Sequence, residues 1–236
     1  EKVGLKPIGG YKMHNWDFMW AAATMEGNSE IAFRAAKFFH EQNSNDMRLI
    51  YSQVRFGKWD DLLATIDGRA FTDPYRIALA YGKAIAYARK GDLKAAQSQY
   101  SDLLDLMKDS SRTVYKIERD VAAGEIAAAR GDYTAAVRSL ESAKDEEDSM
   151  GHAELAGWHQ PVRQVIGKVL IDAGRFADAE KAYRENLEVD PENGWSLIGL
   201  AQALQGQGKT ADATRVMARF HLAWQYADVQ LTASEM

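Results

Sequence analysis

The sequence predicts an all-α fold built from repeated helical hairpins, and three observations support that prediction. Pro is scarce, at four in 236 residues, while about one residue in six is Ala, the strongest helix former. Strand signals are weak, because no stretch sustains an alternation of β-branched and polar residues. The third observation is a short pattern centred on Gly, which returns six times along the chain.

In this pattern a polar residue follows the Gly, a usually large residue stands two places after it, and a usually small residue stands five places after it. Successive glycines are 30, 34, 40, 43 and 34 residues apart. These distances are close to the roughly 34-residue period of a helix-turn-helix repeat. The six glycines are Gly27, Gly57, Gly91, Gly131, Gly174 and Gly208.

Each part of the pattern has a physical reason. A Gly can end the first helix of a pair in a left-handed conformation that other residues avoid. The polar residue then caps the second helix, and Asp92 and Asp132 are the best candidates for this role. The small residue, such as Ala136, lets the second helix approach the first closely. The pattern therefore predicts a turn at each Gly and a helix on either side.

The fifth unit resembles the tetratricopeptide repeat (TPR) family. Gly167, Gly174, Phe176, Ala179 and Pro191 stand where that family has a small residue, a turn Gly, an aromatic residue, an Ala and a closing Pro. The resemblance is strongest from about residue 75 to 219. It implies a right-handed α-solenoid of about six TPR-like helix-turn-helix repeats, with a C-terminal capping helix.

Three further stretches, at 14–18, 55–61 and 158–163, resemble the C-terminal half of large bacterial TPR proteins of unestablished role. This resemblance supports the fold and implies no chemistry.

The expected organisation is a single solenoid domain over 14–219. Residues 1–13, with Pro7 and two glycines, are expected to form an irregular lead-in, and 220–236 a capping helix and tail, with the helix at about 220–231. The expected helix pairs are 15–26 with 29–42, 46–56 with 59–66, 74–90 with 92–108, 113–130 with 132–145, 160–173 with 175–188, and 194–207 with 209–219.

Composition excludes several classes of protein. Twenty-nine Lys and Arg against 34 Asp and Glu leave a net charge of −5, which disfavours a nucleic-acid partner. The absence of Cys excludes a disulfide framework and a Cys-ligated zinc site. Nothing approaches the roughly 18 apolar residues of a transmembrane segment. We expect a soluble protein of the bacterial cytoplasm or periplasm, and the start at Glu1 indicates a processed or truncated product.

No catalytic motif is found, so a non-enzymatic role without a cofactor is expected. There is no Gly-x-Ser-x-Gly elbow for a nucleophilic serine. The stretch 206–210 imitates the end of a phosphate-binding loop, but Ala203 stands where the first Gly of that motif belongs.

An acidic stretch from Asp145 to Glu154 is expected to form a long loop between the fourth and fifth units. Two interpretations remain open: a solvated loop, or a metal or small-ligand site within 145–159. The weak metal-ligand candidates are His152, His159, Glu147 and Asp148, and their spacing fits no established zinc motif. His14 is a second candidate for such a site, or it marks a helix start. The alternative function is therefore a metal- or small-ligand-binding part of a larger enzyme or complex.

The leading hypothesis is a protein-interaction or scaffold module that binds a peptide or protein surface in its concave groove. Oligomerisation is also possible. The inner positions do not carry the Lys and Asn residues with which some TPR proteins bind a terminal carboxylate. An alternative is that the chain's own ends cover part of the groove. The predicted groove residues are Met47, Tyr51, Arg55, Tyr81, Arg89, Glu125, Lys168 and Trp195.

Overall fold

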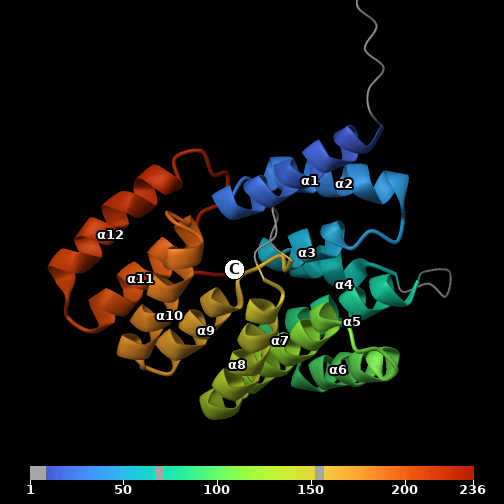
Figure 1. Ribbon diagram of the computed structural model, residues 1–236. Coiled ribbons are helices and arrows are strands. Elements are labelled where there is room, and N and C mark those ends of the chain that lie inside the picture. The colour runs from blue at the N-terminus through green and yellow to red at the C-terminus, as the bar shows by residue number, and fades with distance from the viewer. Residues whose placement is uncertain (1–8, 67–71, 152–156) are drawn as a thin grey trace, which may run out of the picture.

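The computed structural model describes residues 9–66, 72–151 and 157–236, and within them the chain forms twelve helices and no strand. The all-α prediction is confirmed. Consecutive helices pack as six pairs that follow one another around a curve (Figure 1). None of the described helices is both long and apolar enough to cross a membrane. The helices are α1 (Gly9–Glu26), α2 (Ser29–Gln42), α3 (Arg48–Arg55), α4 (Trp59–Ala64), α5 (Asp73–Arg89), α6 (Leu93–Met107), α7 (Thr113–Ala129), α8 (Tyr133–Ser149), α9 (Val162–Asp172), α10 (Phe176–Val189), α11 (Gly194–Gly206) and α12 (Thr210–Ala223).

The turns between paired helices are formed as the repeated pattern predicts. All six glycines of the pattern have a positive φ, between +61° and +80°. This left-handed conformation ends the first helix of each pair at little steric cost only when the residue is Gly. Asp92 and Asp132 cap the following helices, because their carboxylates accept the backbone N–H of Ala95 and Ala135 at 3.0 Å.

Paired helices lie close together because small residues face their neighbours. In α7, a Cβ added at Gly124 would lie 2.6 Å from Cγ of Leu140 in α8, so only Gly allows this approach. The residue five places after each turn Gly is buried in every pair. These residues are Ala32, Leu62, Ala96, Ala136, Ala179 and Ala213.

The curve of helices brings the first pair back to the last. Figure 1 shows α1 and α2 beside the end of the chain that carries α11 and α12. The indole N–H of Trp195, at the start of α11, donates to the backbone oxygen of Thr24 in α1 at 3.1 Å. Trp195 is fully buried in this contact. The first and last repeats therefore cover one another.

The expected capping helix at 220–231 is not formed. α12 ends at Ala223, and residues 227–236 contain no helix. The physical reason is tertiary: the indole of Trp224 lies against two glycines, Gly27 and Gly194, where an added Cβ would come within 2.1 and 2.2 Å of it. Its N–H donates to the oxygen of Val229 at 2.8 Å, which bends the chain back on itself.

Two other expectations about boundaries are corrected. Residues 9–13 belong to α1 rather than to an irregular lead-in, and residues 1–8 lie outside the described residues. Residues 145–149, expected in a loop, form the end of α8. Val162 explains the second difference, because its N–H donates to the carboxylate of Glu147 at 3.0 Å and so joins the end of α8 to the start of α9.

Candidate functional site

The concave face is lined by the first helices of the pairs, and most of the predicted groove residues on it are covered by the chain itself. Residues 157–160 cover one part of this face. The last thirteen residues, 224–236, cover another, and we call them the C-terminal segment. Figure 1 places the end of this segment at the centre of the curve. Among the predicted groove residues, Tyr51, Arg55, Tyr81, Glu125 and Trp195 are buried.

An aromatic cluster forms where residues 157–160 meet α3 and α5. The ring of His159 stacks on Tyr51, with centroids 4.4 Å apart and planes inclined by 7°. The hydroxyl of Tyr81 lies 3.3 Å from Nε2 of His159, and the ring of Trp158 is within 6 Å of both tyrosine rings. Burial, followed by the charge of Arg55, lowers the pKa of His159 well below its usual value, so the imidazole is neutral.

Glu118 of α7 is a buried carboxyl group beneath this cluster. Its side chain is inaccessible to solvent, and Oε1 accepts a hydrogen bond from the hydroxyl of Tyr51 at 2.9 Å. Burial raises the pKa of Glu118 to about 8, although the hydrogen bond from Tyr51 lowers it. The carboxyl group is therefore mostly protonated at neutral pH, and the cluster around it carries no net charge.

Arg55 and Trp195 form a cation–π pair at the junction of the first and last repeats. The guanidinium carbon lies 3.8 Å from the indole centroid, and Arg55 is only 2% exposed. Nε and Nη1 of Arg55 have no hydrogen-bond partner among the described residues. Burial lowers the pKa of Arg55 to about 9, which leaves the group charged at neutral pH. A buried cation with two unused donors is a site where an anion would bind favourably.

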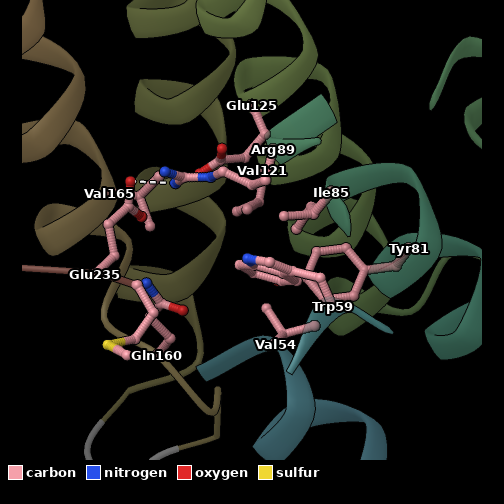
Figure 2. Close-up of a pocket in the computed structure, with 11 residues that line it drawn as sticks. Val54, Trp59, Tyr81, Ile85, Arg89, Val121, Glu125, Gln160, Val165 and Glu235 are labelled. Atoms are coloured by element: carbon pink, nitrogen blue, oxygen red, sulfur yellow. Dashed lines mark hydrogen bonds and ion pairs between the residues drawn. The ribbon is translucent and has the colours of Figure 1, made fainter. Parts of the chain in front are cut away.

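Arg89 of α5 lies between two carboxylates, as Figure 2 shows. Nη2 donates to Oε1 of Glu125 at 2.9 Å and also to Oε1 of Glu235 in the C-terminal segment. The cavity beside this cluster has a volume of only about 10 Å³, so the segment nearly fills the space. Burial first, and then the charge of Glu125, raise the pKa of Glu235 to about 7 against the opposing effect of Arg89.

Next to the contact between Glu235 and Arg89, Ser234 holds the C-terminal segment on the concave face by further polar contacts. Its hydroxyl lies 2.6 Å from the hydroxyl of Tyr183 and donates to the backbone oxygen of Gln164 at 3.1 Å. Tyr183 belongs to α10 and reaches the concave face between Gly167 and Gly199. A Cβ at either glycine would lie within 2.4 Å of the tyrosine ring, so these glycines provide its slot.

The C-terminal segment is also tied to the first repeat. Both oxygens of Asp228 accept backbone N–H groups at the start of α2, from Ser29 at 2.7 Å and from Glu30 at 2.8 Å. A carboxylate at a helix N-terminus is stabilised by the free N–H groups and by the helix dipole. Asp228 therefore fastens the segment from the last repeat onto the first.

One pocket on the concave face stays open, with a volume of about 200 Å³. It lies between α1, α3 and residues 157–159, and it is mainly apolar and aromatic with two charged residues. The two charged residues are Asp17 and Arg48, and the guanidinium of Arg48 donates to the carboxylate of Asp17 at 2.9 Å. Residues lining the pocket include Asp17, Trp20, Met47, Arg48, Tyr51, Trp158 and His159.

The weak metal-ligand candidates that the structure describes do not come together. Glu147 bonds the start of α9, and Asp148 makes a bidentate ion pair with Arg163 at 2.7 and 2.8 Å. His159 lies in the aromatic cluster, and His152 is outside the described residues. No group of three or more His, Cys, Asp or Glu side chains in the described part of the chain is placed to hold a metal ion. His14 is inside α1 and contacts Phe18 rather than marking a helix start.

Comparison with known families adds one decisive observation. Residues 170–220 match a family model described as tetratricopeptide repeat. The protein contains a tetratricopeptide repeat. The matched TPR region runs from the end of α9 into α12, and it includes every residue on which the resemblance of the fifth unit was based except Gly167. In it, Phe176 packs against Gly206, where an added Cβ would lie 2.4 Å from the ring.

One solved structure supports a TPR-like fold over most of the chain. A putative kinesin light chain of Podosopora anserina with nearly identical TPR-like repeats is 13% identical, with a TM-score of 0.52 over 90% of this chain and 94% of that one. MamA of AMB-1 is 18% identical, with a TM-score of 0.47 over 75% of this chain and 96% of that one. At these identities the likeness concerns the fold alone. A comparison with curated proteins gives no match.

Four residues of this TPR site were not among the predicted ones: Glu118, Trp224, Ser234 and Glu235. Glu118 stands one helical turn before Ala122 on a face that the repeat pattern treats as interior, and a charged residue there is a signal of a special contact. The three C-terminal residues carry no such signal, because they lie beyond the last repeat. Lys168, which was predicted, forms an ion pair with Asp172 at 2.6 Å within α9.

Proposed function

We propose that the protein is a non-enzymatic protein-binding module, and that it binds a partner's peptide on its concave face. The observation that supports this best is the open pocket of about 200 Å³ beside the aromatic cluster. Aromatic side chains in a partly enclosed, water-excluding pocket are the usual anchor points of protein interfaces. Asp17 and Arg48 beside the pocket supply polar groups that can orient a partner.

Burial of the titratable groups argues for binding rather than catalysis. A catalytic acid or base has to come within hydrogen-bond distance of a substrate atom. Glu118 is inaccessible to solvent and is engaged with Tyr51, while the ring of His159 is stacked between aromatic neighbours. Their shifted pKa values follow from burial in the core of the concave face.

A pair of matched substitutions tests this proposal. Met47→Lys places a charge in the pocket, and the long aliphatic part of Lys can reach solvent without disrupting α3. Ile66→Lys makes the matched change at a position that is 81% exposed and away from the pocket. We expect a partner that co-purifies with the native chain to be lost with Met47→Lys and retained with Ile66→Lys, at equal thermal stability. Equal recovery with both variants would contradict a role for the pocket.

A further inference from the structure

The C-terminal segment lies on the concave face as a bound peptide would. From residue 227 onward it has no helix, and side chains of three different helices, α5, α10 and α11, contact its last five residues. The amide of Gln202 in α11 donates to the backbone oxygen of Thr232. Ser234 contacts Tyr183, and Glu235 contacts Arg89. Each contact uses a group that another extended peptide could equally supply.

The surface under the segment is organised without it. The ring of Tyr183 is held in a slot between two glycines, so its hydroxyl points at the concave face whatever lies there. Arg89 is held in place by Glu125 of α7. A ligand that meets groups already in position loses less conformational entropy on binding than one that has to order them.

Arg89 gives this surface a group that a carboxyl group of the ligand can meet. Without the segment, Arg89 keeps one carboxylate partner, Glu125, and Arg55 has two donors without a partner among the described residues. In the full chain, the carboxyl group of Glu235 contacts Arg89 and leaves both donors of Arg55 unused. The segment therefore supplies one carboxyl group to the site but does not use all of its donors.

We propose that the concave face binds an extended peptide in which a small hydroxyl residue directly precedes an acidic one, and that residues 231–236 occupy this site as a tethered, displaceable ligand. This inference rests on the proposed function, because it takes the concave face as the binding surface. The tether runs from α12 through the anchors Trp224 and Asp228 and keeps the segment at a high effective concentration. A partner peptide gains access when it competes with the segment or when the segment is released.

The test uses the chain shortened to end at Gln230, which keeps both anchors, and a labelled peptide with the sequence of residues 231–236. The peptide is acetylated and amidated, so that Glu235 carries its only charge. We expect saturable binding to the shortened chain and at least about tenfold weaker binding to the full chain, measured by fluorescence anisotropy. Failure of the peptide to bind a folded shortened chain would overturn the inference.

Peptide variants separate specific recognition from general adhesion. Ser234→Ala removes the hydroxyl that meets Tyr183, and we expect about tenfold weaker binding. Thr232→Ala removes a hydroxyl from an exposed side chain, and we expect unchanged binding. Glu235→Lys places a positive charge beside Arg89 and is expected to abolish binding. Equal binding of all four peptides would contradict the proposed contacts.

A second protein variant keeps the test decisive if the shortened chain does not fold. Ser234→Lys in the full chain puts a charge at a position with no solvent exposure, so the end of the segment leaves the site while the chain keeps its length. We expect it to bind the peptide as the shortened chain does. If Met47→Lys loses the co-purifying partner but the peptide does not bind either variant of the C-terminal segment, this inference alone is overturned. If the peptide binds but recovery of the co-purifying partner is unchanged by Met47→Lys, only the proposed role of the pocket is overturned.

Discussion

The hydroxyl groups of Tyr183 and Ser234 lie 2.6 Å apart on the concave face, although 51 residues separate them in the chain. Tyr183 belongs to the repeat pattern, and Ser234 lies beyond the last repeat. The contact therefore links the solenoid to a segment that the repeat architecture does not require. It is also buried, so each hydroxyl depends on the other for part of its hydrogen bonding.

The first prediction concerns this contact. Tyr183→Phe keeps the ring in its slot and removes the hydroxyl. We expect the free energy of unfolding to fall by about 1 kcal/mol, and amides of residues 232–236 to exchange faster with solvent. Urea unfolding and hydrogen exchange measure the two effects. Tyr226→Phe, at a 78% exposed position, is the control and should change neither quantity. Unchanged exchange in the Tyr183 variant would argue against this anchor.

The second prediction concerns the pH dependence of stability. Glu118 has a pKa of about 8 in the folded protein, against an ordinary value of 4.5 when unfolded. Because the folded value is the higher one, its contribution is fully present below pH 4.5 and is lost as pH rises through about 8. Glu118→Gln removes this titration while keeping an oxygen for Tyr51 to donate to. We expect the variant to lose less stability than the parent between pH 5 and 8.

The difference should be on the order of 2 kcal/mol, because charging a buried carboxyl group is costly. Urea unfolding at several pH values measures it, with Glu188→Gln at an exposed position as the control. If the free energy of unfolding changes with pH in the same way for the parent and the Glu118 variant, this carboxyl group does not determine the pH dependence of stability.

A third prediction compares two turn glycines. Gly27 and Gly91 have similar positive φ values, +74° and +80°, so Ala imposes similar backbone strain at both. An added Cβ meets nothing within 4 Å at Gly91, but at Gly27 it lies 2.1 Å from the indole of Trp224. We expect Gly91→Ala to cost about 1 kcal/mol, and Gly27→Ala about 1 to 3 kcal/mol more.

Only the Gly27 variant should also expose the C-terminal segment to a protease, because it displaces the anchor at Trp224. Thermal unfolding and limited proteolysis of the two variants distinguish backbone strain at the glycine from displacement of the Trp224 side chain. Equal destabilisation of both, with the segment equally protected, would mean that Trp224 does not fasten it.

A fourth prediction concerns the pH dependence of segment binding. The pKa of Glu235 is raised to about 7 on the concave face, so binding of the segment takes up a proton. Its attachment is strongest below the ordinary Glu pKa of 4.5 and weakens as pH rises through about 7. The charged groups facing it are Arg89 of α5, Glu125 of α7, Lys168 of α9 and Arg55 of α3.

Protection of residues 232–236 against hydrogen exchange, corrected for the intrinsic rate, should therefore fall between pH 5.5 and 8. Glu235→Gln should flatten this dependence, because the amide does not titrate. Protection that increases with pH would contradict the assigned direction of the pKa shift.

The helices were predictable because their signals are local. The turn glycines, the caps such as Asp132 and the buried Ala residues recur at fixed distances, so α5 to α12 begin and end within about four residues of their expected bounds. The end of α8 was wrong by four residues, since a charged run there is typical of a solvated loop. In the structure, the carboxyl group of Glu147 accepts a hydrogen bond from the N–H of Val162 in the first turn of α9.

The site could be predicted only in part, because its formation depends on contacts between distant residues. Tyr81 and Arg89 were identified from their inner positions on α5, and both do face the concave side. The alternative that one of the chain's own ends covers part of the groove is confirmed, but the residues that do so could not be inferred, since Ser234 and Glu235 have no periodicity to align. Trp224 was assigned to a helix for the same reason: its neighbours are apolar, and its glycine partners are 30 and 197 residues away.

The clasp between Asp228 and the start of α2 changes how the molecule should respond to pulling force. An open solenoid stretches like a spring, since each repeat touches only its neighbours. Here the first and last repeats are joined, so the molecule is a closed hoop. Tension applied between α1 and α12 acts on the contact between Asp228 and α2 before it acts on any helix pair. The closed ring therefore resists extension until that contact breaks.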